Sequence, residues 1–321
     1  MSDHLNDSVT DSHPSMIQVS ADVKEALHYN QPVVALETVN AFIHGGETNE
    51  KKHETTLLYD QAVRAKGALP VLIAIVDGKL KAGLHHEELE RIFDGNSSIR
   101  KISRRDLPLI LGTKQHGAVS VSAATKIADL MGINIVAAGG MGGVHQNAQL
   151  TYDISPDIYE LATSSVAVVC SGAKSIIDLR LTLEYLETHS VPVLGYQTDV
   201  FPSFCVKETE YPIDRRVESS VEVAEILQRK WVLGLQGGVV VANPVPDEFA
   251  FSPKEMNDLI QSALLALEQT AVPGKERTNF LLDQVSRFSE GRSTSSNIQL
   301  LINNASLAAD IAVDYARETN Q

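Results

Sequence analysis

Short apolar runs alternate along the chain with longer segments in which apolar residues recur at every third or fourth position. An apolar run without polar alternation is typical of a strand that is covered on both faces, as in a parallel sheet. Such runs occupy residues 32–37, 133–140, 165–170, 191–197 and 237–244. Helical spacing predicts amphipathic helices at residues 49–67, 85–95, 120–132, 175–187 and 219–234.

Two further features complete this pattern. Residues 69–84 resemble two strands joined by Asp77–Gly78, a dipeptide typical of a hairpin turn, and the chain from Ser252 onward is almost entirely helical in pattern. Because strands and helices alternate without a Pro-, Gly- or Ser-rich linker, we predict an α/β fold with a mainly parallel central sheet. We expect a single domain at residues 17–321 after a disordered polar tail at residues 1–16.

Charge and composition exclude several classes of protein. The 321 residues carry 27 basic and 41 acidic side chains, and the resulting net charge of −14 argues against nucleic acid as a partner. Two cysteines, Cys170 and Cys205, are too few for a disulfide framework or a cysteine-based zinc site. No apolar run reaches the length of a membrane span, and the first residues lack the apolar core of a signal peptide. We therefore expect a cytoplasmic protein without a membrane partner.

The segment VVCSGAKSIID (Val168–Asp178) places Lys174 where a predicted strand runs into a predicted helix. In open α/β sheets the carboxyl ends of strands carry the chemistry. A P-loop is excluded, because Ala173 separates the glycine from the lysine. Two interpretations stay open: a solvated lysine in the first helical turn, or a catalytic amine whose neutral form the helix N-terminus and partial desolvation favour.

Two other positions offer charged groups. Glu37 closes the strand at residues 32–37, where it either reaches solvent or, if desolvated, acts as a general acid with a raised pKa. The segment RKISRRDLP (Arg100–Pro108) concentrates four cations in six residues. It is either a solvated face balanced by Asp106 or an anion site in which Lys101 or an arginine contacts a phosphate.

A glycine-rich loop follows the predicted strand at residues 133–140. The segment AAGGMGGVH (Ala137–His145) holds four glycines in five positions, but His145 stands where a dinucleotide-binding motif has its third glycine. Glycine at this density is costly unless the backbone adopts unusual angles or admits a ligand. We therefore interpret the loop as one that brings backbone N–H groups to an anionic ligand.

An acidic segment, YDISPD (Tyr152–Asp157), comes next. Asp153, Ser155 and Asp157 alternate, so an extended segment would point them to one side, where their oxygens suit Mg²⁺ or Mn²⁺. Ser155 followed by proline also fits a helix N-cap, and the two interpretations are compatible. Asn297, near the start of another predicted helix, is interpreted from the residues alone as a further cap.

Several segments resemble, in this order, those of the pseudouridine-5′-phosphate glycosidase family. They are VVALE, KISRRDLP, GGMGGVH, TYDISPD, SGAKSIIDL with TLEYLE, GYQT and SNIQLLINNA. The resemblance extends from Ile17 to Tyr315. It implies a three-layer α/β/α fold and, commonly, a homotrimer.

The resemblance also implies a reaction. Members of this family reversibly cleave the C–C bond between ribose C1′ and uracil C5 of pseudouridine 5′-phosphate, which gives uracil and ribose 5-phosphate. The implied mechanism opens the ribose ring and forms a Schiff base between a lysine and C1′, and the imine acts as an electron sink. Lys174 matches this lysine, Glu37 matches the proton donor, and Asp153 matches the metal ligand, usually of Mn²⁺.

The remaining family positions bind the substrate, a sugar phosphate joined to a nucleobase. Of these, Lys101 is the implied phosphate partner, His145 lies beside the sugar and Asn297 lies near the base. The matching positions in this chain are Lys101, Val121, His145, Ser155, Asp157 and Asn297.

The chain departs from the family in places that we expect to face the ligand. Where the family reads ESTIISHGMP, this chain has ETVNAFIHGGET, one residue longer before His44. Ala138, Gln146 and Leu150 replace a frequent threonine, arginine and histidine, respectively. The enzyme is therefore either a pseudouridine-5′-phosphate glycosidase with altered contacts or a C-ribosyl synthase that joins ribose 5-phosphate to another aglycone in natural-product biosynthesis.

Two other classes of function remain as alternatives. A sensor of phosphorylated nucleosides would need neither an amine nucleophile nor a proton donor, so the presence of both Lys174 and Glu37 argues against it. A sugar-phosphate aldolase would share the Schiff-base lysine but not the segment near Asn297, and it would release triose products.

Overall fold

The strands form one sheet that is mostly parallel. The computed structural model describes residues 16–95, 98–270, 272 and 277–319. In chain order the strands of this part are β1 (Ile17–Val19), β2 (Val33–Leu36), β3 (Leu69–Val76), β4 (Lys79–Ala82), β5 (Ile99–Ile102), β6 (His116–Val119), β7 (Ile135–Ala137), β8 (Ala167–Cys170), β9 (Val193–Tyr196), β10 (Arg215–Val217) and β11 (Val239–Ala242). Their order across the sheet is β1-β4-β3-β2-β7-β8-β11-β9-β10, with β6 and β5 branching from β3. Among the described strands, only the β3–β4 and β3–β6 pairs are antiparallel.

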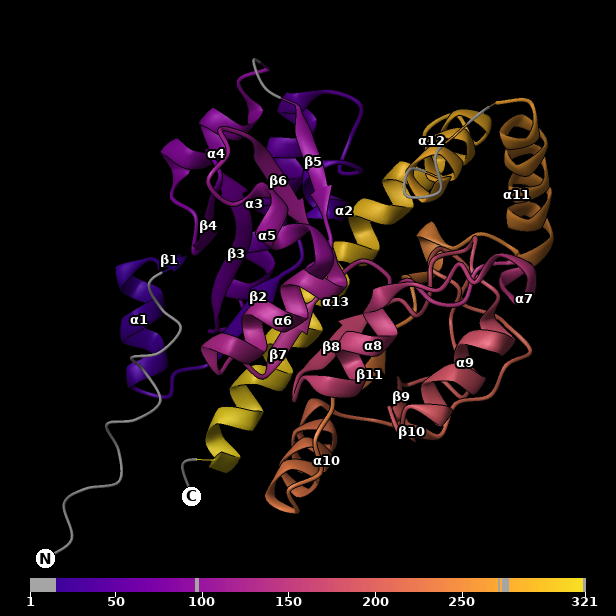
Figure 1. Ribbon diagram of the computed structural model, residues 1–321. Coiled ribbons are helices and arrows are strands. Elements are labelled where there is room, and N and C mark those ends of the chain that lie inside the picture. Colours follow the sequence, from indigo (N-terminus) through magenta and orange to yellow (C-terminus); the bar gives the residue numbers. More distant parts are fainter. Residues whose placement is uncertain (1–15, 96–97, 271, 273–276, 320–321) are drawn as a thin grey trace, which may run out of the picture.

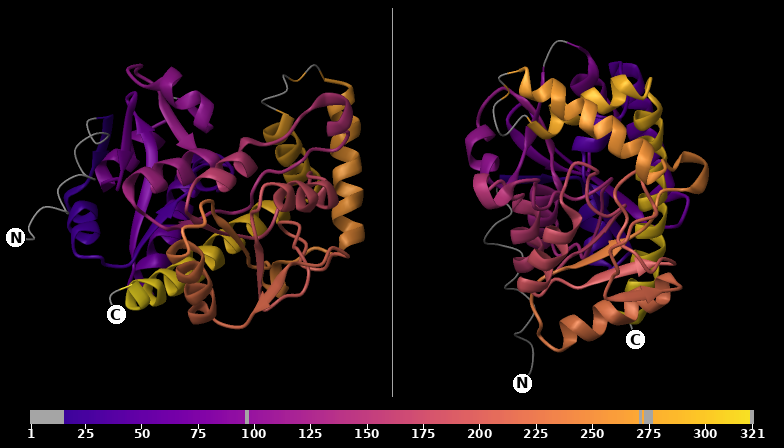
Figure 2. Two further views of the ribbon diagram at one scale, coloured as in Figure 1. Left: turned by 60° about the horizontal axis from the view of Figure 1, so that its bottom comes forward. Right: turned by 90° about the vertical axis from the view of Figure 1, so that its right-hand side faces the viewer.

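Helices cover both faces of this sheet, as predicted (Figures 1 and 2). The described helices are α1 (Ala21–His28), α2 (Val39–Phe42), α3 (Asn49–Arg64), α4 (His86–Phe93), α5 (Leu107–Ile110), α6 (Val121–Met131), α7 (Ala148–Thr151), α8 (Pro156–Thr163), α9 (Leu179–Thr188), α10 (Ser220–Val232), α11 (Pro253–Glu268), α12 (Arg277–Phe288) and α13 (Arg292–Thr319). The long helix α13 packs on β2, β7 and β8 with α3 and α10 beside it, and α6 packs with α8 on the opposite face. The helices α11 and α12 pack on each other to one side of the sheet.

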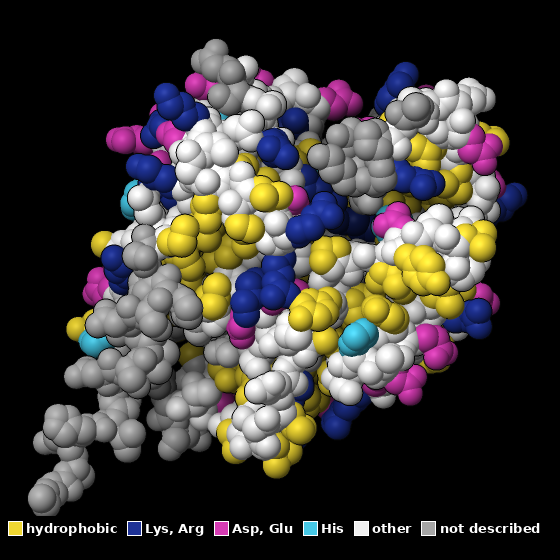
Figure 3. Space-filling view, viewed as in Figure 1, with side chains coloured by type: hydrophobic (Ala, Val, Ile, Leu, Met, Phe, Trp, Pro, Cys, Tyr) yellow, Lys and Arg dark blue, Asp and Glu magenta, His cyan; other side chains and the backbone are white. Residues whose placement is uncertain are grey.

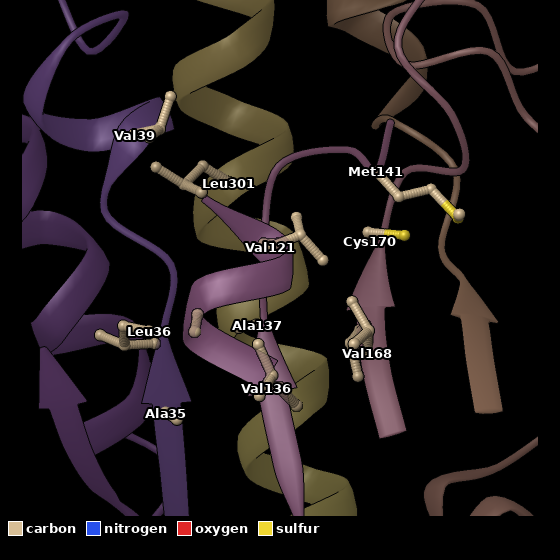
Figure 4. Packing of buried hydrophobic residues seen from close by; sticks show 14 of the residues in the cluster. Ala35, Leu36, Val39, Val121, Val136, Ala137, Met141, Val168, Cys170 and Leu301 are labelled. Carbon is tan, nitrogen blue, oxygen red and sulfur yellow. The ribbon is translucent and has the colours of Figure 1, made fainter. Parts of the chain in front are cut away.

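The core lies between α6 and α13. Figure 4 shows Leu36 of β2, Val136 of β7 and Val168 of β8 in the sheet, with Val121 of α6 and Leu301 of α13 among the residues that pack around it. Each of these side chains is at most 1% exposed. Burying a Val, Leu or Ile side chain contributes about 1.5–3 kcal/mol, so this layer fixes where the strands end.

Strongly patterned elements were predicted correctly, and weakly patterned ones were missed. The β3–β4 hairpin turns at Asp77–Gly78, where φ is 49° and 69°, as a primed turn requires. The short strands β1, β5 and β10 were not predicted, because most of their residues are partly or fully exposed and they carry no apolar run. Strand β6 was missed too, since its sequence HGAV has no signal of its own although all four residues are buried.

Two predictions concern the environment and the N-terminus of the chain. In the part of the chain that the structure describes, no helix is both long enough and apolar enough to cross a membrane. The predicted tail at residues 1–16 lies outside the described residues, apart from Met16.

Candidate active site

The candidate site lies where the carboxyl ends of β2 and β8 approach the carboxyl end of β6, which runs in the opposite direction. Glu37 follows β2, and Lys174 follows β8, which runs parallel to it two strands away. Strand β6 runs antiparallel to β3 and so arrives from the opposite side. Thr38 N donates to Val119 O at 3.2 Å, and Val119 N donates to Thr38 Oγ1 at 2.9 Å. These bonds place the residues after β6 beside those after β2.

Lys174 is nearly buried, with 4% of its surface exposed. Its backbone N donates to Met141 O at 2.9 Å, which ties the segment after β8 to the glycine loop after β7. The Lys174 side chain lines a cavity, and among the described residues its amine makes no hydrogen bond or ion pair. A solvated surface lysine is therefore excluded, and the amine is available to a ligand.

The helix after Lys174 begins later than the sequence predicted. Helix α9 starts at Leu179 rather than at Ser175, because the Asp178 carboxylate accepts a hydrogen bond from Leu181 N at 3.0 Å and caps the helix there. Gly172 has φ +67° and turns the chain before the lysine. Lys174 therefore lies in a loop, and the contribution expected from a helix N-terminus is absent.

Glu37 is completely buried. Its Oε2 accepts hydrogen bonds from Asn40 Nδ2 at 2.9 Å and from Asn40 N at 3.3 Å, whereas Oε1 has no partner among the described residues. Burial raises the pKa of Glu37, and the opposing influences of the Lys174 charge and the Asn40 hydrogen bonds do not cancel it. Because Oε2 is occupied as an acceptor, Oε1 is the oxygen on which a proton would reside. This is the desolvated carboxyl that the sequence allowed as a general acid.

A cavity of ≈ 830 Å³ opens beside Lys174. Figure 3 shows Lys and Arg side chains, in dark blue, gathered around a hollow in the middle of this face. Five cations line the cavity against the three carboxylates Asp106, Asp153 and Asp157. The cations are Arg100, Lys101, Arg105, Lys174 and Arg277. In a protein with a net charge of −14 this local excess suits a small anion.

Lys101 is a cation of this cavity with a lowered pKa. It belongs to β5 and is partly buried. Burial, and then the charge of Lys174, lower the pKa of Lys101 to about 8. Arg104, by contrast, pairs with Glu160 at 3.1 Å and is absent from the residues that line the cavity. The segment Arg100–Pro108 thus supplies cations to the anion site and, through Arg104, to a structural ion pair.

The lowered pKa of Lys101 predicts an alkaline limb in the pH profile of kcat/KM. Above about pH 8 the free enzyme loses this ammonium, so kcat/KM for a phosphorylated substrate should fall about tenfold per pH unit. In Lys101→Arg the guanidinium stays charged, and the limb should move above pH 9. Steady-state rates between pH 6 and 10 measure this, and an unchanged limb in the variant would assign it to another group.

Asp157 organises the backbone around the cavity. Its Oδ1 accepts from Ser122 N and its Oδ2 accepts from Gly142 N, both at 2.8 Å, which ties the start of α6 to the glycine loop. Ser155 caps α8, as predicted, with its Oγ accepting from Asp157 N at 3.3 Å. Because α8 begins at Pro156, the predicted extended alternation ends there, although Ser155 and Asp157 still line the same cavity.

Val121 has a buried side chain that is 1% exposed, so only its backbone N–H at the start of α6 is suited to contact a substrate. A helix N-terminus that presents free N–H groups favours phosphate or carboxylate oxygens. Of the neighbouring amides, Ser122 N is already bonded to Asp157. We therefore expect Val121 to contact the substrate through its main chain only.

Asp153 and His145 form the polar end of the cavity. His145 N donates to Asp153 O at 3.0 Å, and burial lowers the pKa of His145 although the Asp153 charge opposes it. A neutral imidazole and a carboxylate are both metal donors. Within the described residues no group of three or more His, Cys, Asp or Glu side chains is placed to hold a metal ion. The pair fits a divalent cation only if water or substrate oxygens supply most of its ligands, as Mg²⁺ and similar ions often require.

The dense glycines of the loop after β7 are explained by close packing. A Cβ on Gly139 would lie 2.8 Å from Asn40 Cγ, and a Cβ on Gly142 would lie 2.3 Å from Ser155 Oγ. Neither residue has a positive φ. The glycines thus allow two site side chains to approach the loop, and the amide of Gly142 is bonded to Asp157 rather than free for an anion.

A second cavity of ≈ 500 Å³ lies between α2, α12 and α13. Asn40, His44 and Asn297 line it. Asn297 lies inside α13 rather than at its start, so it is not a cap; its Nδ2 donates to His44 O at 3.1 Å. Lys174 lines the first cavity, and the next residue, Ser175, lines the second, so the two cavities are lined by neighbouring residues of the same loop.

His44 is held neutral by its surroundings. Its side chain is 10% exposed, and burial followed by the charges of Lys174 and Lys101 lowers the pKa of His44 to about 3. An unfolded histidine titrates near 6.5. The stability that this histidine contributes is therefore complete above about pH 6.5 and is lost as the pH falls toward 3.

Acid should accordingly destabilise the wild-type protein more than a His44→Gln variant. Lowering the pH from 7 to 5 should reduce the free energy of unfolding of the wild type by about 2 kcal/mol through His44. This contribution should be absent in His44→Gln. Urea unfolding at both pH values measures the difference, with His28→Gln as the exposed-histidine control. Equal pH dependence in wild type and His44→Gln would contradict the buried neutral imidazole.

Sequence reasoning missed Asn40, His44 and Arg277 as residues of the two cavities. Asn40 and His44 lie in the segment that departs from the family motif, so that departure was the available signal, whereas Arg277 gave none. Other departures do not face either cavity, contrary to expectation. Gln146 is exposed and Leu150 is 78% exposed. Ala138 is buried, and its carbonyl accepts from Asn304 Nδ2 at 2.9 Å.

Comparison with known proteins shows the family to which this chain belongs. The model of the family "Indigoidine synthase A like protein" matches residues 22–314. A pseudouridine-5′-phosphate glycosidase of Clostridium botulinum is 44% identical over 301 residues, which are 94% of this chain and 97% of that protein. The Escherichia coli pseudouridine-5′-phosphate glycosidase is 44% identical over 304 residues, 95% of this chain and 97% of that protein.

Solved structures show the same fold. The prealnumycin C-glycosynthase AlnA, in complex with ribulose 5-phosphate, has a TM-score of 0.86 at 33% identity, covering 95% of this chain and 99% of that one. An indigoidine synthase A-like protein from Thermotoga maritima has a TM-score of 0.82 at 32% identity, covering 95% of this chain and 98% of that one. The chain therefore belongs to the indigoidine synthase A-like family of enzymes, among the relatives of the pseudouridine-5′-phosphate glycosidases.

Proposed function

We propose that this enzyme reversibly cleaves the C–C bond of pseudouridine 5′-phosphate to give uracil and ribose 5-phosphate, through a Schiff base on Lys174. The observation that carries the proposal is the buried Lys174 amine, which lines the cationic first cavity and has no hydrogen-bond or ion-pair partner among the described residues, while the next residue, Ser175, lines the second cavity. A sugar phosphate in the first cavity and a base in the second would place the bond to be broken beside this amine. The identities of 44% with named glycosidases support the same substrate.

The proposed chemistry balances with the residues present. The Lys174 amine adds to C1′ as the ring C1′–O4′ bond opens, and Glu37 protonates the departing O4′. Cleavage of the C1′–C5 bond leaves its electrons on uracil, which takes a proton at C5, while the nitrogen lone pair forms the imine with C1′. Water hydrolyses the imine, releasing ribose 5-phosphate and the amine. In the reverse direction the protonated imine is the electron sink that accepts C5 of uracil.

The remaining residues bind the substrate in this proposal. Lys101 holds the phosphate, His145 lies beside the sugar, and Ser155, Asp157 and the main chain of Val121 shape the same cavity. We further propose one Mn²⁺ per subunit, with Asp153 as its protein ligand. When bound, the ion would supply charge stabilisation and orientation of substrate oxygens. We expect the reaction to take place in the cytoplasm.

A second candidate is a C-ribosyl synthase that joins ribose 5-phosphate to a different aglycone. The structural likeness to a C-glycosynthase, with a TM-score of 0.86 over 95% of this chain, favours it. The altered segment at residues 38–48 also favours it, because this segment lines the second cavity. The two candidates share the sugar chemistry and differ only in the aglycone.

We also propose that the enzyme is a homotrimer. Tyr152 lines the first cavity and is 84% exposed, and Leu150, two residues before it, is 78% exposed. Exposed apolar groups of this size usually contact a partner when they cluster. Sedimentation equilibrium on the full chain measures the mass, and a Tyr152→Lys, Leu150→Lys double variant should dissociate. A monomeric wild-type protein would contradict the proposal.

The test is the direct reaction. Purified enzyme is incubated with pseudouridine 5′-phosphate and Mn²⁺, and uracil and ribose 5-phosphate are quantified by chromatography; equal amounts are expected. Formation of pseudouridine 5′-phosphate from uracil and ribose 5-phosphate checks reversibility. Without uracil release, borohydride trapping of ribose 5-phosphate on the protein would favour the synthase, and triose products would favour an aldolase.

A further inference from the structure

The side chain of Asn304 lies where three neighbouring strands end. Helix α13, which carries Asn304, packs against β7 and β8 (Figure 4). Asn304 Nδ2 donates to Ala138 O at 2.9 Å and to Gly139 O at 3.2 Å, just after β7. Its Oδ1 accepts from Asn243 Nδ2 at 3.0 Å, just after β11. The Oγ of Ser171, the residue after β8, lies 3.2 Å from Asn304 Nδ2. One amide therefore contacts the carboxyl ends of three parallel strands.

Asn304 is placed to act on the protein rather than on a ligand. It is 0% exposed and lines neither of the two cavities. The regular pairing of β7 with β8 ends at Ala137, so the Ala138 carbonyl lies beyond it and receives its donor from α13. The amide has one favourable orientation, because a flip would turn its oxygen toward two carbonyl groups.

Backbone hydrogen bonds connect this point to the lysine loop, residues 171–174. Ser171 N donates to Gly139 O at 2.9 Å, so the carbonyl that the α13 amide holds also holds the start of this loop. Two residues further along the glycine loop, Met141 N donates to Gly172 O at 2.9 Å. Lys174 N in turn donates to Met141 O at 2.9 Å. The backbone of Lys174 thus takes its position from the glycine loop, which the α13 amide fixes at its start.

We propose that Asn304 is a positioning residue for Lys174, because it sets the separation between the glycine loop and the lysine loop. The inference rests on the proposed function in that the Lys174 amine must reach C1′ of the sugar phosphate. A displacement of about 1 Å far from the reacting atoms can cost about 100-fold in rate. The proposed phosphate contacts come from β5 and α6, so loss of Asn304 should slow imine formation and leave noncovalent binding nearly unchanged.

The test compares Asn304→Ala with Asn303→Ala. Asn303 is the next residue of α13, and its Nδ2 donates to Pro244 O at 3.3 Å, so the control also loses a bond from this helix to a backbone carbonyl. Rapid mixing with ribose 5-phosphate, a borohydride quench and mass spectrometry give the rate constant of imine formation. This rate constant should fall about 100-fold in Asn304→Ala and stay within about threefold of wild type in Asn303→Ala.

Two further measurements separate positioning from a purely structural role. Calorimetry with ribitol 5-phosphate, which has no aldehyde, gives the noncovalent Kd, and this should stay within about threefold of wild type in both variants. Hydrogen exchange in peptides covering residues 139–145 and 171–178 should be about tenfold or more faster in Asn304→Ala and unchanged in Asn303→Ala. If Asn304→Ala does not fold, Asn243→Ala takes its place, since it removes only the donor to Asn304 Oδ1.

The outcomes separate this inference from the proposed function. A wild-type rate of imine formation in folded Asn304→Ala, with only a lower unfolding midpoint, would assign the amide to stability and overturn the inference. A rise in Kd for ribitol 5-phosphate as large as the fall in rate would overturn it too, because the whole site would then be disturbed. If the wild type forms no adduct on Lys174, the proposed function fails, and hydrogen exchange alone decides the inference. Unchanged exchange in both loops would then refute it.

Discussion

Replacing Lys174 with alanine is expected to lower kcat for uracil release by about 10⁴-fold or more, because Lys174 is the only buried lysine among the described residues and lines the first cavity. The proposed pathway forms and breaks a covalent bond to this nitrogen, so positioning by the remaining residues cannot replace it. Rapid-quench and steady-state assays with pseudouridine 5′-phosphate measure the loss. Mass spectrometry after borohydride treatment should show the ribose 5-phosphate adduct in the wild type and not in the variant.

Two further variants separate covalent catalysis from electrostatics. Lys174→Arg retains a positive charge but forms no imine, so it should be as inactive as Lys174→Ala. Lys66→Ala removes an exposed lysine that pairs with Asp310 at 2.9 Å, and it should retain wild-type activity. Substantial turnover by Lys174→Arg would show that the lysine acts through its charge and would refute the Schiff base.

Replacing Glu37 with glutamine should lower kcat by about 10²- to 10⁴-fold, the range typical of general acid–base groups. Glutamine has nearly the same shape, and its carbonyl oxygen can still accept from Asn40, so the loss would reflect the missing proton. Because burial raises the pKa of Glu37, the wild type carries the proton to higher pH than an exposed carboxyl would. The wild-type kcat should fall as the pH rises through that pKa, and the variant profile should lose this limb.

Glu37→Gln should retain the sugar half of the chemistry. Borohydride trapping of free ribose 5-phosphate on Lys174 tests this, since imine formation from the open-chain aldehyde does not require release of the base. Glu50→Gln serves as control, because Glu50 lies in the first turn of α3 and lines neither cavity. A kcat within a few-fold of wild type for Glu37→Gln would exclude Glu37 as the proton donor.

The sequence predicted most of the fold because the core elements carry strong local patterns. The strands β2, β8 and β11 are uninterrupted apolar runs, and the hairpin after β3 has its turn dipeptide. The start of α9 was predicted too early because Ile176 and Ile177 continue the helical spacing, although Asp178 caps the helix after them. In the loop these two side chains are buried by tertiary packing instead.

The sequence alone indicated which residue types could form the site and that several of them follow predicted strands. Lys174 and Glu37 were identified in this way, and the structure shows that both are buried. The partner of Glu37 was not visible, since Asn40 is an ordinary residue in a short helix until its contact with Oε2 is known. The antiparallel branch of β6, which brings Lys101 near Lys174, has no local signature either.

What the sequence by itself determined is the order of the strongly patterned strands and helices, the acidic net charge and the candidate groups Lys174, Glu37, Lys101 and Asp153. These follow from apolar periodicity and residue chemistry, which act over a few neighbouring positions. Only the tertiary structure decided which groups are desolvated, which oxygens lack a partner, and that Lys174 and Ser175 line two different cavities. Burial and electrostatic shifts depend on atoms brought together from distant parts of the chain, such as β2, β5, α12 and α13, and no local pattern contains that information.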